Sequence, residues 1–437
     1  MVPRNAIGRA IWVAHMYIRL AGEWLRTGVA YRPLSRGFVA DPYPLYRTLR
    51  ERDPIHRSIF ANQVVVSRYA DVDRILRDHR TFGNDFSKVT SSEGSIATRK
   101  KLTPSMLAQD PPDHTRLRAL VNRAFTPRQV ARMEDYIRAT AHTLLDKVGD
   151  AREFDLMKAF AVPLPTIVIA RMIGVPERDL ARFKVWSDDL ARALEPFLSP
   201  EEEERVYRAA RQFAEYFTAI IEQRRREPRD DLVSRLVEAE DAGDKLTAEE
   251  TRVMLRLLLT AGNETTTNLI GNGIRALLRH PDQLALLRER PELIPTAVEE
   301  LLRYDPPVQL DMRVALRDME LGGLAVKEGT MITLLIGSAN HDPQRFPEPE
   351  RLDITRSGQA NISFGRGIHH CLGAPLARLE GRIALEVLLE RFPRARLRQA
   401  PGEVPAKHRP EGAGAPRRAG GLSGPGVDRR WARVSSV

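Results

Sequence analysis

Residues 247–279, TAEETRVMLRLLLTAGNETTTNLIGNGIRALLR, form the pattern that most limits the possible folds of this chain. Thr247 followed by Glu250 is a capping box, and the His280-Pro281 step ends the run. At 1.5 Å per residue, such a helix spans roughly 50 Å. Apolar residues cover nearly every face of it, which is typical of a helix that runs through the core. We therefore expect a large, mainly α domain built around this helix.

The middle of the same helix, AGNETTT, contradicts the local rules for a buried helix. Glycine at 262 costs about 1 kcal/mol relative to alanine, and a buried carboxylate at 264 costs several kcal/mol unless it is hydrogen-bonded. Such breaks are expected at functional sites. We expect Gly262 to let a ligand approach the backbone, Thr265 to supply a hydroxyl and Glu264 to pass protons. The alternative is that Glu264 and Thr265 face solvent.

The rest of the chain is predicted to be helical, with a minor β part. Apolar residues recur at helical spacing almost without interruption between 112 and 303. Residues 81–110 lack periodicity, and a loop of that length inside a domain is usually a lid or a binding loop. The other predicted segments are a hairpin of IHRSIF and QVVVSR around Ala61-Asn62, short strands at 308–316 and 331–336, and a last helix at about 371–391.

Composition divides the chain into three parts. Residues 1–30 form an amphipathic extension, whose helix either packs on its own domain or lies on a membrane surface. Residues 31–400 show no repeat and no linker, and we expect them to form a single large domain. Residues 401–437 are basic and rich in Gly and Pro, a composition typical of disorder or of an atypical, frameshifted end.

Charge and cysteine content exclude several classes of protein. The net charge is +10, but the segment from residue 394 to the end holds ten Lys or Arg and three acids, so most of the excess is local. A basic tail without interleaved aromatic residues is weak support for nucleic-acid binding, and we expect none. The chain contains no apolar run long enough to span a membrane. The single cysteine excludes an internal disulfide.

That cysteine, Cys371, lies in SFGRGIHHCLGAPLARLE, among glycines and histidines and before a predicted helix. Two pairs of charged residues elsewhere have helical spacing. His114 and Arg118, at i and i+4, could both reach one anion, and Glu300 and Arg303, at i and i+3, could form an ion pair. Taken alone, each pair can also be explained as ordinary charged residues on a solvated helix surface.

Taken together, these segments resemble the cytochrome P450 superfamily of haem-thiolate monooxygenases, in its soluble bacterial type. The family pattern Phe-x-x-Gly-x-His/Arg-x-Cys-x-Gly is filled at every fixed place, and AGNETT and Glu300-x-x-Arg303 match two further patterns in the right order. The resemblance covers roughly residues 31–395. The residues that fill the cysteine pattern are Phe364, Gly367, His369, Cys371 and Gly373.

The resemblance implies the P450 fold, mainly α with a minor β part, and haem b (iron protoporphyrin IX) as the cofactor. It implies that Cys371 is the axial ligand of the iron. The implied propionate-binding residues are His114, Arg118, Arg313 and His369. Gly262, Phe364 and Gly373 are implied to lie against the haem, and Glu300, Arg303 and Arg351 to form a structural network on the thiolate side.

The resemblance also implies the reaction: one oxygen atom from O2 enters a mid-sized apolar substrate. Thr265 would hydrogen-bond dioxygen, and Glu264 with water would deliver protons. The sequence contains no Gly-rich dinucleotide fingerprint, so we expect electrons from a separate ferredoxin or flavodoxin with its NAD(P)H-dependent reductase. The substrate pocket is expected to involve 81–110, 193–200, Ala261 and the segment from Val308 to Leu310. A cytoplasmic monomer is expected.

The tail leaves a second interpretation open. In related chains the last forty residues usually return to β-structure, and here EGAGAPRRAGGLSGPGVDRRWARVSSV shows little β pattern. The alternative to the monooxygenase is therefore a haem-binding protein without turnover, either a sensor or a product inactivated by its atypical end. The Glu264-Thr265 pair favours the enzyme, because haem binding alone needs no proton relay.

Overall fold

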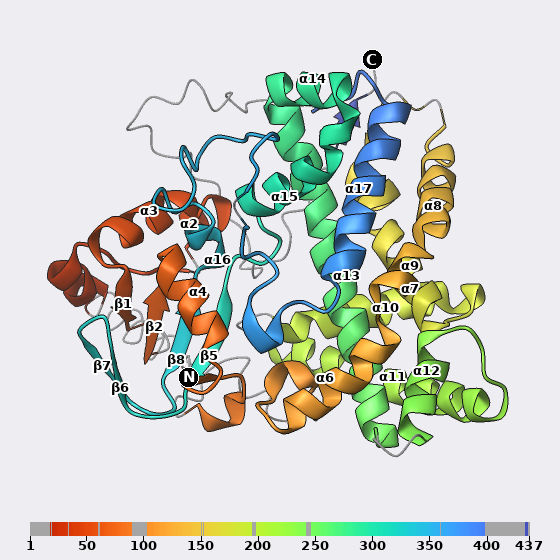
Figure 1. Cartoon of the computed structure of the whole chain (residues 1–437), viewed down its shortest axis with the longest axis horizontal. Helices are drawn as coiled ribbons and strands as arrows, with labels where there is room; N and C mark the ends of the chain where they lie inside the picture. The colour runs from red at the N-terminus through yellow and green to blue at the C-terminus, as the bar shows by residue number, and fades with distance from the viewer. Residues whose placement is uncertain are drawn as a thin grey trace.

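The computed structural model describes residues 18, 20–33, 35–59, 62–89, 103–149, 151, 153–194, 198–241, 246–358, 360–397 and 433–435. A large helical part and a smaller part that contains most of the strands lie side by side (Figure 1). The fold is therefore mainly α with a minor β part, as the sequence predicts. No helix among the described residues is both long and apolar enough to cross a membrane.

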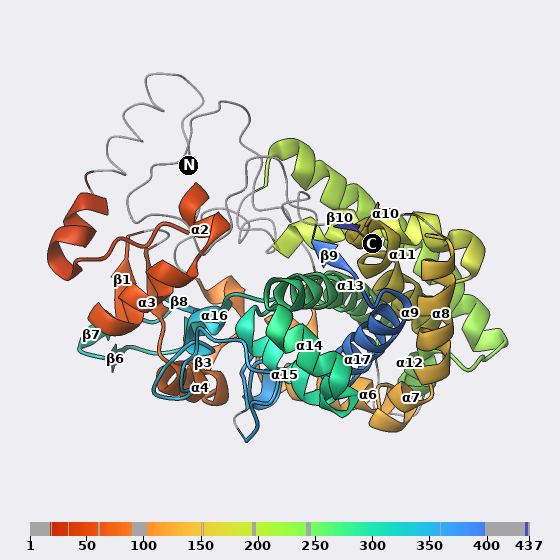
Figure 2. The same ribbon diagram turned by 90° about the horizontal axis from the view of Figure 1, so that it is seen from above.

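Helix α13 (Ala248–Arg279) is the centre of the helical part. The Thr247 side chain accepts from the backbone of Glu250, and the Glu250 side chain accepts in return, so the predicted capping box is confirmed. Figure 2 shows α13 running between α10 and α11 on one side and α14, α15 and α17 on the other. Its main partners are α9 (Pro163–Ile173), α10 (Leu180–Ala191), α11 (Pro200–Arg226), α15 (Ile294–Tyr304) and α17 (Ala374–Arg391).

The remaining helices surround this group or cover the sheet. They are α2 (Arg36–Ala40), α3 (Tyr43–Arg52), α4 (Tyr69–Arg77), α6 (Asp113–Ala124), α7 (Pro127–Ala131), α8 (Glu134–Asp146), α12 (Leu232–Asp241), α14 (Pro281–Glu289) and α16 (Ile336–Ala339). Residues 20–27 form a further helix. Short 3-10 or π turns lie at Phe86–Lys88, Met106–Ala108, Met157–Ala161, Glu177–Asp179, Arg192–Leu194, Pro291–Leu293 and Gly367–His369.

The main sheet has five strands in the order β1-β2-β8-β5-β3. Strands β1 and β2 form the predicted hairpin, with Ile55 opposite Val66, and β5 and β8 confirm the strands predicted after residue 308. Strand β2 is parallel to β8, whereas the other pairs are antiparallel. The bounds are β1 (Ile55–Ser58), β2 (Gln63–Val66), β3 (Phe82–Gly83), β5 (Asp311–Ala315) and β8 (Met331–Leu334), and β6 (Met319–Leu321) pairs with β7 (Leu324–Val326).

A small third sheet involves the C-terminal end of the chain. Strand β10 (Arg433–Ser435) lies between β4 (Glu153–Asp155) and β9 (Arg396–Leu397) and is antiparallel to both. The composition of the tail predicts little β-structure, so this strand is a departure from the prediction. Residues 398–432 lie outside the described part of the chain, and the prediction of a disordered tail concerns mostly those residues.

Two large hydrophobic clusters meet at the middle of α13. One contains Met254, Leu255, Leu258 and Leu259 and extends into α10, α11 and α12. The other contains residues from Leu269 onward and extends into α8, α15 and α17. Between Leu259 and Leu269, α13 contributes no residue to either cluster. The segment that breaks the helix rules therefore lies between the two halves of the core.

Candidate active site

The loop before α17 fixes the position of Cys371. The backbone N–H of Cys371 donates to the carbonyl oxygen of Phe364 over 2.9 Å, which closes the loop. Gly365 and Gly367 both have left-handed φ angles, +67° and +68°. A Cβ on Gly367 would lie 2.6 Å from the carbonyl oxygen of Leu76, so only glycine fits between this loop and α4.

Further contacts hold the loop from behind. Asn340 donates to the Ser363 hydroxyl over 2.8 Å, and that hydroxyl donates to the carbonyl oxygen of Leu302 over 2.7 Å. The Arg378 guanidinium lies 4.6 Å from the centre of the Phe364 ring and pairs with Glu299. The cysteine loop is thus attached to α15, α16 and α17, and its backbone is preorganised before any ligand binds.

The electrostatic surroundings of Cys371 suit a metal thiolate. The side chain is exposed on one side, but the protein packed behind it desolvates the thiol and raises its pKa. In the opposite sense, the backbone N–H groups of Gly373 and Ala374, at the start of α17, hydrogen-bond the sulfur, and Arg118 acts with them to lower the pKa. The effect of burial is the larger one, so the pKa of the Cys371 thiol is raised and the free thiol stays protonated. A metal cation would be needed to stabilise the thiolate.

The four residues predicted to hold carboxylates come together from separate elements. His114 and Arg118 lie one turn apart on α6, Arg313 is on β5, and His369 precedes Cys371. The rings of His114 and His369 have their centres 4.1 Å apart. Burial, and then His114, Arg313, Arg118 and His79, lower the pKa of His369 to about 3.

This group of residues is not fully satisfied by the protein alone. Nδ1 of His114 is buried and has no hydrogen-bond partner among the described residues. Arg313 is 2% exposed and pairs with Asp311, whose Oδ2 lies 3.0 Å from Nη1. Arg118 influences both His369 and Cys371. An anionic ligand with two carboxylates and a metal would satisfy the two arginines, the hydrogen-bonding groups of the histidines and the thiol at once, so the residues present fit haem.

The centre of α13 presents two different groups on two faces. The Thr265 hydroxyl is exposed and donates to the carbonyl oxygen of Ala261 over 2.8 Å, and Ala261 is itself exposed in the middle of a core helix. Burial and the nearby Asp188 raise the pKa of Glu264, and Arg192 partly opposes them. A raised pKa brings this carboxyl closer to half-protonation at neutral pH, as a proton donor requires.

Sequence reasoning missed the residue that fixes this part of α13. Asn263 is 5% exposed, accepts from the Thr166 hydroxyl over 2.8 Å and donates to the Ser187 hydroxyl over 2.8 Å. It therefore joins α13 to α9 and α10 through a buried and satisfied amide. The only signal in the sequence was that Asn263 is a polar residue in a helix that is apolar on most faces. That signal does not show that Thr166 and Ser187 are its partners.

Gly262 does not occupy the environment predicted for it. A Cβ at this position would lie 3.5 Å from Ile169 on α9, an ordinary contact. A side chain at position 262 would therefore point into the contact between α13 and α9 and not into open space. A ligand approaching the backbone at Gly262 would have to come from another side of α13.

The network predicted for Glu300, Arg303 and Arg351 needs one correction. Arg303 makes a two-point ion pair with Glu300, with contacts of 2.7 and 2.8 Å, and both residues are almost fully buried. The Arg351 guanidinium is exposed and pairs with Glu348, and only its carbonyl oxygen accepts from Arg303. The second cation is Arg356, whose Nε lies 3.2 Å from Glu300. The turn at Glu348 directs Arg351 outward.

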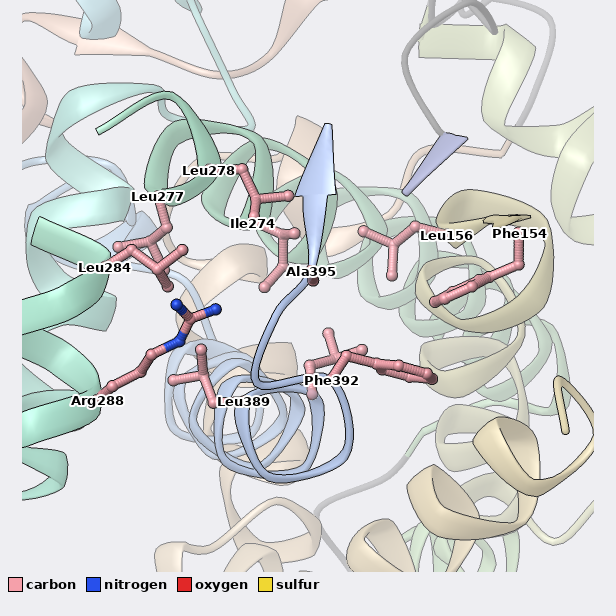
Figure 3. Close-up of a pocket in the computed structure, with 11 residues that line it drawn as sticks. Phe154, Leu156, Ile274, Leu277, Leu278, Leu284, Arg288, Leu389, Phe392 and Ala395 are labelled. Atoms are coloured by element: carbon pink, nitrogen blue, oxygen red, sulfur yellow. The ribbon is translucent and has the colours of Figure 1, made fainter. Parts of the chain in front are cut away.

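Two cavities flank the centre of α13 without reaching it. The apolar cavity in Figure 3, about 30 Å³, lies where the C-terminal ends of α13 and α17 approach α14. The other, about 180 Å³, lies at the N-terminal end of α13. It is lined by Thr103, Pro104, Ser105, Met106, Gln109, Leu117, Thr247, Glu249, Glu250, Val253 and Met254. Neither contains Thr265 or Cys371, so the site is defined by its side chains and not by these cavities.

The profile of the family "Cytochrome P450" matches residues 56–292 and 286–401 of the chain. The chain belongs to the cytochrome P450 family. This P450 is 42% identical over 386 residues to the polyketide biosynthesis cytochrome P450 PksS of Bacillus subtilis, covering 86% of this chain and 94% of that protein. It is 41% identical to the cytochrome P450 monooxygenase PikC of Streptomyces venezuelae, over 85% of this chain and 88% of that protein.

Solved structures agree with this assignment. The crystal structure of PksS superimposes with a TM-score of 0.80 at 40% identity, over 93% of this P450 and 99% of that chain. P450BioI, solved in complex with an acyl carrier protein that carries hexadec-9Z-enoic acid, superimposes with a TM-score of 0.77 at 40% identity, over 84% and 96% of the two chains. The protein is a P450 oxidoreductase, a haem enzyme of the monooxygenase class.

Proposed function

We propose that this P450 inserts one oxygen atom from O2 into a mid-sized apolar organic molecule, with electrons from a ferredoxin or flavodoxin and its NAD(P)H-dependent reductase. The observation that carries the proposal is the position of Arg118, which acts electrostatically on both the Cys371 thiol and His369, one of the four residues predicted to hold carboxylates. The proposed metal ligand and the proposed binding site for carboxylates thus lie next to each other.

The cofactor that fits is haem b, which supplies the binding and activation of dioxygen when it is present. Cys371 would ligate its iron, and the N–H groups of Gly373 and Ala374 would stabilise the thiolate. The residues that would hold its two propionates are His114, Arg118, Arg313 and His369. Phe364, packed beneath Arg378, would shield the sulfur side from water.

Thr265 and Glu264 would handle protons. The exposed Thr265 hydroxyl can accept a hydrogen bond while it donates to Ala261, and it is the polar group that α13 exposes at this level. Glu264 faces the Asp188 and Arg192 side, with a raised pKa that suits proton donation. Asn263 directly precedes them, and its bonds to Thr166 and Ser187 fix the rotation of α13 against α9 and α10.

An extended apolar substrate is supported by the surroundings of the site and by the relatives. Ala261 and Val308 are exposed, as expected of residues that line a substrate pocket. PksS is named for polyketide biosynthesis, and P450BioI was solved with a fatty acid on its carrier protein. We therefore propose a fatty-acyl or polyketide chain. The predicted lid segments are described only in part, because residues 90–102 and 195–197 lie outside the described chain.

Several arginines near the cysteine loop could contact an acidic electron donor, but acids of this chain already pair with them. Arg366 and Arg378, near Cys371, pair with Asp73 and Glu299 of this chain, and Arg116 pairs with Glu250. An acidic ferredoxin or flavodoxin would have to compete with these acids, so we propose weak, salt-sensitive association. We further propose that the enzyme is a cytoplasmic monomer.

The test is turnover with isotopically labelled O2. The haem-loaded protein is supplied with a surrogate ferredoxin, its reductase and NADPH, and a panel of medium- and long-chain fatty acids is screened by Soret shift. Incorporation of one labelled oxygen into a bound fatty acid would support the proposal. If haem is reduced and the acids bind but no label enters any product, the alternative of a haem-binding protein without turnover is the better account.

A further inference from the structure

The helix at 20–27 has one face that is firmly attached to the domain. Leu20 and Glu23 are buried, at 6% and 0% exposure. The Glu23 carboxylate accepts from the backbone N–H groups of Tyr31 and Ile59, over 2.7 and 2.9 Å, and contacts His56 Nε2 at 2.8 Å. A buried carboxylate with three partners fixes how the helix is rotated against the β1 strand.

The opposite face of this helix is apolar and exposed. Ile18, Trp24 and Leu25 are 68%, 56% and 76% exposed. Ile18 and Leu25 are seven residues apart and lie on the same side of a helix, with Ala21 between them and Trp24 adjacent. Seven large hydrophobic residues are exposed among those described, and three of them lie within these eight positions. Because Glu23 holds the other face inward, this face cannot turn toward the core.

The segment of sequence that contains the exposed face is strongly basic. Residues 1–36 contain six arginines and a single acid, Glu23, and that acid is fully buried in its contact with His56. Arg26, Arg32 and Arg36 are exposed. A second copy of the same face would bring arginine against arginine, which opposes a symmetric dimer. An anionic surface would be attracted.

We propose that this helix binds the surface of a bilayer that contains anionic lipids. Trp24, Leu25 and Ile18 would enter the boundary between headgroups and acyl chains, and the exposed arginines would contact lipid phosphates. The helix lies at the outer edge of the molecule, red at the left of Figure 1, so the surface can reach it without contact to the helical part. It lies on the membrane and does not cross it.

Vesicle co-sedimentation tests this proposal with the full-length holoenzyme. We expect binding to vesicles of phosphatidylcholine with phosphatidylglycerol, a blue shift of tryptophan fluorescence on binding, and weakening at high salt. The Trp24→Ser/Leu25→Ser variant should bind at least tenfold more weakly. Val185→Ser, which alters an exposed apolar residue on α10, is the matched control and should bind like the wild type.

A second variant separates charge from apolar contact. Arg26→Glu/Arg32→Glu should lose at least tenfold in affinity for the anionic vesicles, since each arginine near such a surface contributes roughly fivefold. Thermal unfolding of both variants checks that the fold is intact. The proposal is overturned if phosphatidylcholine vesicles bind the protein as well as the anionic ones, if the folded variants bind like the wild type, or if light scattering shows a dimer that the Trp24→Ser/Leu25→Ser variant abolishes.

Discussion

Arg118 donates from Nη2 to the backbone carbonyl oxygen of His370 over 2.8 Å, and so attaches α6 to the residue that precedes Cys371. The same guanidinium lowers the pKa of the Cys371 thiol and of His369. One side chain therefore takes part in the shape of the cysteine loop, in the charge at the sulfur and in the group of four residues predicted to hold the propionates.

Replacement of Arg118 is expected to weaken haem binding. Arg118→Ala removes one charge-assisted contact to a propionate, of the kind that contributes about 1.5–3 kcal/mol, and one hydrogen bond to the loop that is formed without the cofactor as well. The affinity of the apoprotein for haem, measured by titration, should fall roughly tenfold to a hundredfold. Arg123→Ala, an exposed position on the same helix, serves as the control. Equal affinities for the two variants would refute the role given to Arg118.

The two arginines after Glu348 are expected to differ in their effect on stability. Arg356→Ala leaves Arg303 as the one cation paired with the buried Glu300 among the described residues, and should lower the free energy of unfolding by about 2 kcal/mol. Arg351→Ala removes only an exposed ion pair with Glu348 and should change the free energy of unfolding by less than about 0.5 kcal/mol. Chemical denaturation of the two variants measures this difference. If Arg351→Ala proved more destabilising than Arg356→Ala, Arg351 would be the second arginine of the Glu300 network, as predicted from the sequence.

His56 is expected to make stability fall at high pH. Burial lowers the pKa of His56, but its contacts to Asp53 and Glu23 outweigh burial and raise the pKa to about 9. The stabilisation, about 3 kcal/mol from the size of the shift, is fully present below the unfolded value near 6.5 and is lost as the pH rises through about 9. Unfolding measured from pH 6 to 10 should show this loss, and His56→Gln should remove the dependence. Parallel curves for the two proteins would contradict the assignment.

Glu380 is expected to destabilise the protein at alkaline pH. This residue on α17 is 1% exposed, its Oε2 has no partner among the described residues, and burial raises its pKa to about 8. Between about 4.5 and 8 the unfolded chain ionises this carboxyl while the folded chain keeps the proton, so stability falls as the pH rises. Glu380→Gln should therefore be more stable than the wild type by several kcal/mol at pH 8, with the gain shrinking toward pH 5. A gain that does not depend on pH would mean that titration is not the cause.

The parts of the fold that depend on local sequence could be predicted. Helix α13 follows from a capping box and an apolar run, and the β1–β2 hairpin follows from two short β-rich runs around Asn62. Strand β10 could not be predicted, because its pairing with β4 and β9 joins residues that are distant in the chain and its own segment has little β pattern. Long-range pairing of this kind leaves no local signal.

The candidate site was predictable only where a short pattern fixes the position of a residue. Cys371 and Thr265 are predicted from such patterns. The resemblance predicts His114, Arg118, Arg313 and His369 as one group, and the structure brings these four residues together. His79 and Asn263 were missed because tertiary packing alone gives them their neighbours. The choice of Arg356 over Arg351 depends on the backbone turn at Glu348, which the sequence FPEPER does not reveal.

The spectrum of the reduced, carbon-monoxide-bound protein tests the central claim most directly, because it reports the atom that ligates the haem iron. The wild-type protein should show the strongly red-shifted Soret band of a thiolate ligand, and Cys371→Ser should bind haem and lack that band. A haem-loaded wild-type protein without the shifted band, or a Cys371→Ser variant that retains it, would contradict the assignment of Cys371 as the ligand and the function built on it.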